Sequence, residues 1–159
     1  MRLEMNSGGK MLNYRKANIN DVDKLVALRK RQLIDEGASP VDNIDKELEQ
    51  YFTSSIREET LVVWIATKCD NIIATSGVCF FQYPPNFSNT TGKVAYITNV
   101  YTQEEYRKQG IATKLLEFIM DEIKKRDYKF VRLHASSQGK KLYKQLGFID
   151  AEGFMTKML

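Results

Sequence analysis

The sequence lacks the features that mark several common classes of protein. Its two cysteines, Cys69 and Cys79, are too few for a disulfide framework, and their apolar, strand-like surroundings predict buried free thiols. No apolar run approaches the roughly 20 residues that a membrane-spanning helix needs. The start of the chain lacks the apolar core of a secretory signal, so the cytoplasm is the expected compartment.

Length and composition instead predict one globular domain. The chain has 159 residues, of which 43% are hydrophobic and 28% are charged, and this balance fits one domain with one core. No repeat, low-complexity tract or inter-domain linker interrupts it. The polar, glycine-containing start over residues 1–11 is interpreted as a flexible leader, and residues 12–159 as the single domain.

The positive charges are concentrated in one part of the chain. Residues 103–145 hold eleven lysines and arginines against six acids, whereas the rest of the chain holds thirteen against fourteen. Such an excess indicates a phosphate-bearing partner, either nucleic acid or a nucleotide cofactor, or else only a solvated helix face. Residues 20–60 show the opposite balance, with ten acids against six basic residues.

The spacing of apolar residues changes along the chain between every second residue, which is typical of strands, and about every 3.6 residues, which is typical of helices. This pattern predicts both strands and helices. The expected strands cover residues 12–18, 60–69, 72–83, 93–102, 129–136 and 153–159. The expected helices cover residues 21–37, with Asn20 as the cap, and residues 44–59, 110–125 and 137–148. A tight turn at Asp70 and Asn71 would join two of the strands into an antiparallel hairpin.

This order of elements predicts a mixed sheet. The strand–helix–strand unit over residues 93–136 implies a crossover between parallel strands, whereas the preceding hairpin implies antiparallel neighbours. The expected fold class is therefore α/β, or α+β with a mixed sheet, with helices on both faces.

The segment YRKQGIATKLL, residues 106–116, has the composition of an anion site. A helix that begins at Gly110 directs unpaired backbone N–H groups and the positive end of its dipole outward. Ala112 and Thr113 keep the approach open, and Arg107 and Lys108 add full positive charges. The segment predicts a pyrophosphate cradle, and a surface helix start with charged neighbours is the alternative.

Two nucleotide-binding signatures are absent. The chain has no G-x-x-x-x-G-K-[ST], which excludes the phosphate loop of the NTPases. It has no G-x-G-x-x-G after the first strand, which disfavours a dinucleotide-binding fold. What remains is a cradle in the middle of the chain, followed by a strand and the run KLYKQLGF.

At these residues the sequence resembles the GNAT superfamily of N-acetyltransferases. The stretch VYTQEEYRKQGIATKLL, residues 100–116, is similar to the acetyl-CoA signature R/Q-x-x-G-x-G/A, matched by Arg107, Gly110 and Ala112. The stretch ASSQGKKLYKQLGF, residues 135–148, is similar to the second signature, a short helix with a tyrosine followed by Gly-Phe.

The resemblance implies a fold and a reaction. The fold is GNAT-like, a central, strongly twisted mixed sheet with helices on both faces. The reaction moves an acetyl group from acetyl-CoA, as co-substrate and without a metal, to a primary amine by direct attack in a ternary complex. The acceptor would be a small molecule or a peptide, with no nucleic-acid or membrane partner, and a homodimer is left open.

The resemblance also implies roles for individual residues. The strand end would pair with the pantetheine arm, and the Val100 N–H would polarise the thioester carbonyl. Arg107 and Lys108 would flank the phosphates. The remaining contacts with the co-substrate are implied for Asn99, Tyr101, Gln109, Gly110, Ile111, Ala112, Thr113 and Ser136, with Ile111 mainly packing. The chain departs from the family pattern at Thr102, Ser136 and Gly139, where proline, asparagine and alanine are frequent.

Tyr143 is the expected catalytic acid, which protonates the leaving thiolate; a packing tyrosine is the alternative. The general base is less defined, because the strand over residues 93–102 contains no acid. A water chain, His134 or an acid of residues 20–60 such as Asp42, Asp45 or Glu49 could serve.

A non-catalytic module that binds CoA or nucleic acid is the alternative to an enzyme. Nucleic-acid binders combine basic patches with exposed stacking aromatics. Here Phe118, on the basic helix, occupies a position that packing explains better, which favours the enzyme.

Overall fold

The computed structural model describes residues 2–5, 11–137, 139–151 and 155–158. One six-stranded sheet runs through it in the order β1-β2-β3-β4-β5-β6. Its strands are β1 (Arg2–Met5), β2 (Met11–Lys16), β3 (Leu61–Lys68), β4 (Asn71–Gln82), β5 (Lys93–Thr102) and β6 (Phe130–Leu133). All neighbours are antiparallel except β5 and β6, which are parallel. The predicted mixed sheet and crossover are therefore confirmed.

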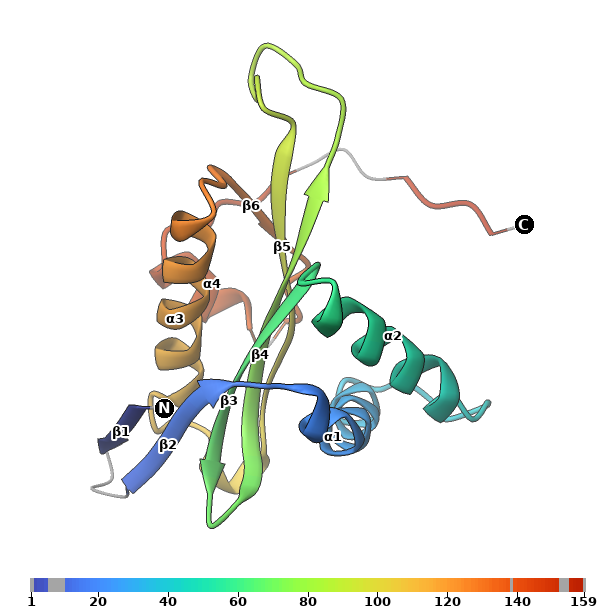
Figure 1. Cartoon of the computed structure of the whole chain (residues 1–159), viewed down its shortest axis with the longest axis vertical. Helices are drawn as coiled ribbons and strands as arrows, with labels where there is room; N and C mark the ends of the chain where they lie inside the picture. Colours follow the sequence, from blue (N-terminus) through green and yellow to red (C-terminus); the bar gives the residue numbers. More distant parts are fainter. Residues whose placement is uncertain (1, 6–10, 138, 152–154, 159) are drawn as a thin grey trace.

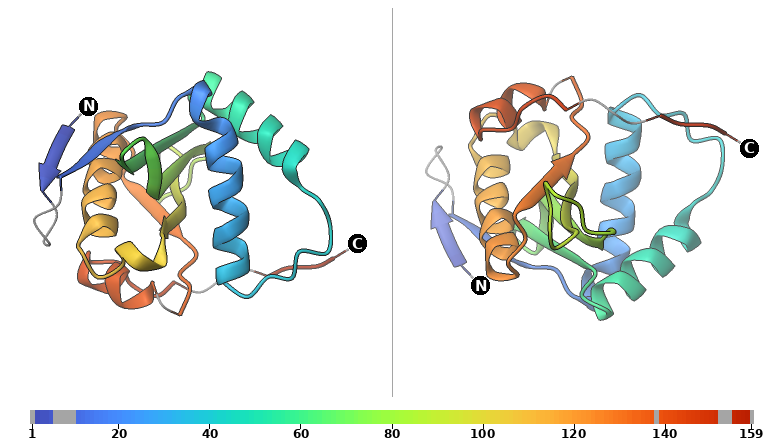
Figure 2. Two further views of the ribbon diagram at one scale, coloured as in Figure 1. Left: turned by 90° about the horizontal axis from the view of Figure 1, so that it is seen from below. Right: turned by 90° about the horizontal axis from the view of Figure 1, so that it is seen from above.

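Helices cover both faces of this sheet, as predicted (Figures 1 and 2). On one face lie α1 (Val22–Asp35), which follows the short helix η1 (Ile19–Asp21), and α2 (Asp45–Arg57). On the other lie α3 (Ile111–Lys125) and the short α4 (Lys140–Gln145). Another short helix, η2 (Glu104–Tyr106), links β5 to α3. Within the described residues, no helix is both long enough and apolar enough to cross a bilayer.

The core has two layers, one on each face of the sheet. Leu25 of α1, Phe52 of α2 and Ile65 of β3 are buried in the first layer. Leu115 and Ile119 of α3 are fully buried in the second. Since β3 and β4 lie between the two layers, their side chains are buried on both faces, which explains their nearly continuous apolar sequences.

The unit β5–α3–β6 positions the region of the predicted cradle. Only Val94–Ile97 of β5 pair with β6, so the last residues of β5 extend beyond the end of that ladder. The chain then passes through η2 and enters α3 at the same end of the sheet. The crossover thus places the N-terminus of α3 beside the end of β5 that β6 does not reach.

The structure corrects two predictions near the N-terminus. Arg2–Met5 form strand β1, paired antiparallel with β2, where a flexible leader over residues 1–11 was expected. The boundary of the single domain at residue 12 stays a prediction. The cap at the start of the first helical segment is Asn18, not Asn20, because the Asn18 side chain accepts from the Asn20 N–H while Asp21 accepts from the Asn18 N–H.

The hairpin turn lies one residue earlier than predicted. Cys69 and Asp70 both have positive φ, as a two-residue turn of type I′ requires, and Asn71 already pairs with Lys68. Cys69 is consequently exposed, contrary to the expectation of a buried thiol, whereas Cys79 is buried as expected.

The C-terminal part of the chain also differs from its prediction. Helix α4 covers only Lys140–Gln145 of the expected residues 137–148. Residues 155–158 form no strand, and their side chains are exposed, so no burial offsets the entropy cost of ordering them. Residues 153, 154 and 159 of the expected strand lie outside the described residues. Within the described sheet, β6 is therefore an edge strand.

Candidate active site

A cavity of about 820 Å³ lies where β5, α3, α4 and the C-terminal end of α1 meet. The predicted site residues that line it are Val100, Tyr101, Arg107, Lys108, Gly110, Ile111, Ala112, Thr113, Ser136 and Tyr143. Asn99 and Gln109 were also predicted but do not line this cavity. The structure thus brings together most of a set that is spread over 44 sequence positions, from Val100 to Tyr143.

A β-bulge distorts β5 at the wall of the cavity. Thr75 of β4 pairs with Tyr101 and Gly77 pairs with Thr98, so Asn99 and Val100 have no partner residue in β4. Both also lie beyond the residues that pair with β6. Asn99 has a φ of 51°, a left-handed conformation that asparagine tolerates better than most residues.

Hydrogen bonds from neighbouring elements hold this bulge in place. The Thr75 hydroxyl donates to the Asn99 carbonyl at 2.7 Å. The buried amide of Gln32, in α1, lies 3.5 Å from the Val100 carbonyl. Within the described sheet, the Val100 peptide therefore lies at the cavity wall with no paired residue in either β4 or β6.

The start of α3 forms the opposite wall. Lys108 and Gly110 both have positive φ, and Gly110 caps the helix. The helical ladder begins with the Lys114 N–H, which donates to the Gly110 carbonyl at 3.0 Å, so the three preceding N–H groups have no partner within the helix. A Cβ at Gly110 would meet no heavy atom within 4 Å. The geometry is that of an open, positively polarised anion cradle.

Arg107 connects this loop to the end of α1. Its Nε donates to the Thr102 carbonyl at 3.0 Å, and one Nη lies 3.3 Å from an oxygen of Asp35. The Tyr101 hydroxyl donates to the same carboxylate oxygen at 2.6 Å. The Tyr101 hydrogen bond and the Arg31 and Arg107 charges lower the pKa of Asp35. Two nitrogens of the Arg107 guanidinium are thus engaged by Thr102 and Asp35. Lys108, in contrast, is exposed.

Tyr143 of α4 lies in the cavity wall and is 8% exposed. Within the described part of the chain its hydroxyl has no hydrogen-bond partner. Burial and, secondarily, the charge of Glu36 raise its pKa to about 12. The phenol therefore remains protonated throughout the neutral range, as a proton donor must.

Gly139 explains how the Tyr143 ring is accommodated. A Cβ at Gly139 would lie 2.9 Å from Cε2 of Tyr143, so the ring occupies the space of the missing side chain. The Ser136 hydroxyl, 3.2 Å from the Gly139 N–H, accepts a hydrogen bond from it and fixes this turn. The departures from the family pattern at Ser136 and Gly139 thus belong to one local arrangement.

Gly139→Ala is expected to displace the Tyr143 ring and to lower kcat at least tenfold, because a catalytic group that is shifted by a fraction of an ångström loses its alignment. The thermal midpoint should change by only a few degrees, since Gly139 has an ordinary right-handed backbone conformation that alanine adopts without strain. Steady-state kinetics with thermal unfolding would measure both. An unchanged kcat would show that the position of the ring does not matter.

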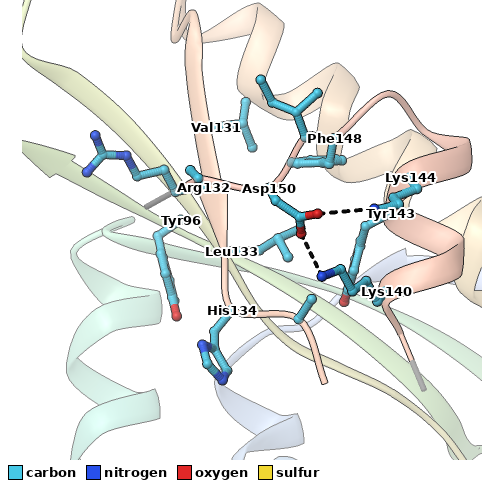
Figure 3. Close-up of a pocket in the computed structure, with 13 residues that line it drawn as sticks. Tyr96, Val131, Arg132, Leu133, His134, Lys140, Tyr143, Lys144, Phe148 and Asp150 are labelled. Carbon is cyan, nitrogen blue, oxygen red and sulfur yellow. Dashed lines mark ion pairs between the residues drawn. The ribbon is translucent and has the colours of Figure 1, made fainter. Parts of the chain in front are cut away.

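A second cavity, of about 510 Å³, is also lined by Tyr143 (Figure 3). Asp150 sits there between the ammonium groups of Lys140 and Lys144, at 2.8 and 3.1 Å. His134 lines this second cavity and is exposed, just beyond the end of β6. The structure therefore does not bring the histidine into the wall of the larger cavity.

The acids suggested from the sequence also lie elsewhere. Asp42 is exposed in a loop, Asp45 pairs with Lys30, and Glu49 lines a shallow groove along α2. The acids in the cavity wall are instead Asp35 and Glu36, at the C-terminal end of α1. A signal for them exists in the sequence, because the dipole of a helix disfavours two acids in its last turn.

Comparison with known proteins places this architecture in a family. The model of the GNAT acetyltransferase domain matches residues 59–150. A predicted acetyltransferase from Clostridium acetobutylicum, solved with acetyl-CoA, is 44% identical and superimposes with a TM-score of 0.90, covering 93% of this chain and 96% of that one.

More distant structures share the fold. A GCN5-related N-acetyltransferase from Ralstonia eutropha JMP134 is 20% identical, with a TM-score of 0.86 over 92% of this chain and 98% of that one. The glucosamine-6-phosphate N-acetyltransferase from Arabidopsis thaliana is 23% identical, with a TM-score of 0.72 over 94% of this chain and 99% of that one. A search of curated proteins found no match. The domain match over more than half of the chain and the 44% identity show that the chain belongs to the GNAT family of acetyltransferases.

Proposed function

We propose that this acetyltransferase transfers the acetyl group of acetyl-CoA to a primary amine by direct attack, with both substrates bound in the larger cavity. The observation that carries the proposal is that one cavity brings together an anion cradle, a bulged strand and a phenol that has no hydrogen-bond partner among the described residues. The Clostridium acetobutylicum structure with acetyl-CoA, 44% identical to this chain, supports the co-substrate.

The residues present fit acetyl-CoA. The Gly110 cradle has open space for an anion, and the Ile111, Ala112 and Thr113 amides supply donors for the pyrophosphate. Polar groups of the wall also lack partners in the described residues: the buried Thr102 hydroxyl has none. Bound acetyl-CoA supplies an activated thioester, and the remaining chemistry belongs to the residues of this chain.

Each predicted contact residue has a role in this proposal. Gln109 continues the row of amides, Lys108 adds a mobile positive charge, and Arg107 flanks the phosphates while it braces Asp35. Along β5, Asn99, Val100 and Tyr101 offer backbone groups to the pantetheine arm. Ser136 also lines the cavity, and in this proposal it contacts the same arm.

Val100 and Tyr143 would act on the reacting atoms. The Val100 N–H, at the bulge, donates to the thioester carbonyl oxygen and stabilises the negative charge that develops on it. The neutral acceptor amine attacks the thioester carbon and releases a proton to water, and Tyr143 supplies a proton at the sulfur as the carbon–sulfur bond breaks. The hydroxyl of Tyr143 is the only one of these groups that can be removed without changing the backbone, and it is therefore the most direct to test.

A cationic acceptor amine is expected to be preferred over an anionic one. Residues 20–60, which contain α1 and α2, carry ten acids against six basic residues, and the end of α1 reaches the cavity. The preference should appear mainly in KM and weaken with salt, because exposed charges are screened within about 10 Å at 0.1 M. Equal KM values for matched cationic and anionic amines at low and high salt would contradict it.

Two measurements test the proposed function itself. Calorimetry should detect binding of acetyl-CoA, and a panel of small amines and peptides should include acceptors that release free thiol from it. A DNA-binding assay at two salt concentrations provides the counter-test. DNA binding without acetyl-CoA binding would contradict the proposed acetyl transfer and would favour a nucleic-acid-binding module.

A further inference from the structure

We infer that Glu36 binds the acceptor through a cationic group other than the amine that is acetylated, and that it makes this enzyme selective for cationic acceptors. The inference rests on the proposed function, because it concerns the second substrate of the same cavity. The negative charge of α1 and α2 as a whole suggests a preference for cationic amines, and we attribute this preference to the Glu36 carboxylate.

The two acids at the end of α1 differ in their partners. Asp35 accepts from the Tyr101 hydroxyl at 2.6 Å and from Arg31 at 3.0 Å, and it contacts Arg107 at 3.3 Å. Its charge is therefore balanced within the protein. Glu36 lines the same cavity, and no cation among the described residues pairs with it. Of these two acids, only Glu36 has its charge available to a ligand.

A buried amide holds Glu36 in position. The Gln32 side chain, 5% exposed, donates to the Glu36 carboxylate at 2.9 Å. The same amide nitrogen lies 3.5 Å from the Val100 carbonyl, at the bulge. The buried Gln32 amide thus connects the Glu36 carboxylate to β5, beside which the thioester carbonyl is proposed to lie.

Tyr143 gives an independent indication of what occupies the space between these walls. It is more than nine-tenths buried, it borders the same cavity as Glu36, and its hydroxyl has no partner in the described residues. The charge of Glu36 is close enough to contribute to the raised pKa of Tyr143. With its cationic end held by Glu36, an acceptor would extend its other, neutral amine into the same cavity toward Val100 and Tyr143, where the acetyl group must be transferred.

The position of Glu36 is also unfavourable for the helix. A carboxylate at a helix C-terminus interacts unfavourably with the helix dipole, whereas a lysine or arginine there would be stabilising. The last turn of α1 contains no basic residue. A ligand cation in the cavity would neutralise the Glu36 carboxylate and so relieve its repulsion from the negative end of the α1 dipole.

The experiment compares three amines of matched length: 1,5-diaminopentane, 6-aminohexanamide and 6-aminohexanoate. Their dissociation constants are measured by calorimetry on protein saturated with CoA, and their kcat and KM by thiol release from acetyl-CoA. The wild type should bind the diamine most tightly. Glu36→Gln should weaken diamine binding about tenfold or more, in dissociation constant and in KM, and leave the amide unchanged.

The matched control is Glu49→Gln, which removes the same charge from the outer side of α2, away from the cavity. It should leave all three amines unaffected, and both variants should bind acetyl-CoA like the wild type. No preference for the diamine in the wild type, or an equal effect of the two substitutions, would overturn the inference about Glu36. Failure of the proposed function would instead appear as absent acetyl-CoA binding in the wild type.

Discussion

Replacement of Gly110 by aspartate is expected to weaken acetyl-CoA binding by well over tenfold while the fold is retained. The Cβ of the new residue would enter the open space in front of the N-terminus of α3, and its carboxylate would stand where the pyrophosphate is proposed to bind. Two negative groups would then compete for the same backbone amides. Calorimetry with acetyl-CoA measures the loss, and circular dichroism checks the fold.

Gly37→Asp provides the matched control for this prediction. Gly37 also has a positive φ, and its Cβ position is equally open, but it lies outside the cavity. Both substitutions introduce the same charge, and each places a side chain at a positive φ, which costs of the order of 1–2 kcal/mol. Only the Gly110 variant should lose acetyl-CoA affinity. If both variants bind acetyl-CoA alike, the cradle is not the pyrophosphate site.

Tyr143→Phe is expected to lower kcat by about 10²–10⁴-fold with little change in acetyl-CoA affinity, the usual range for loss of a general acid. The ring and its edge-to-face contact with Phe148 would remain, so the change removes only the hydroxyl. Steady-state kinetics with the best acceptor of the panel measures kcat, and calorimetry measures the affinity. Retention of most of kcat would make Tyr143 a packing residue.

The raised pKa of Tyr143 defines how its proton moves. A phenol with a pKa of about 12 is a weaker acid than a thiol at about 8.5, so complete transfer to the thiolate is uphill by roughly 5 kcal/mol. The proton is therefore shared as the carbon–sulfur bond breaks, and solvent completes the transfer. Phenylalanine cannot share a proton, which is why kcat and not the binding of acetyl-CoA should change.

The parts of the site that follow from local sequence signals could be predicted. Gly110 followed by an apolar stripe indicates a helix start, and the alternation of strand and helix over residues 93–136 requires a parallel crossover. Together they place the cradle next to the end of β5, as the structure has it. The structure brings most of the predicted cradle residues to one cavity, and their contacts with acetyl-CoA stay a prediction.

The parts of the site that depend on long-range packing could not be predicted from the sequence. The bulge at Asn99 and Val100 arises from the register between β4 and β5 and from the Thr75 hydrogen bond, and no local pattern indicates either. Glu36 reaches the cavity only because α1 ends beside β5. Its unfavourable position at a helix end was the available signal, but Asp42, Asp45 and Glu49 were considered for their charge alone.

The crystal structure of this protein with acetyl-CoA is the measurement that tests the central claim most directly. The pyrophosphate should lie on the backbone amides of Ile111–Thr113, the pantetheine arm beside residues 99–101, and the acetyl group between the Val100 N–H and the Tyr143 hydroxyl. Acetyl-CoA bound in the second cavity beside His134 and Asp150, or with its pyrophosphate away from the start of α3, would contradict the account.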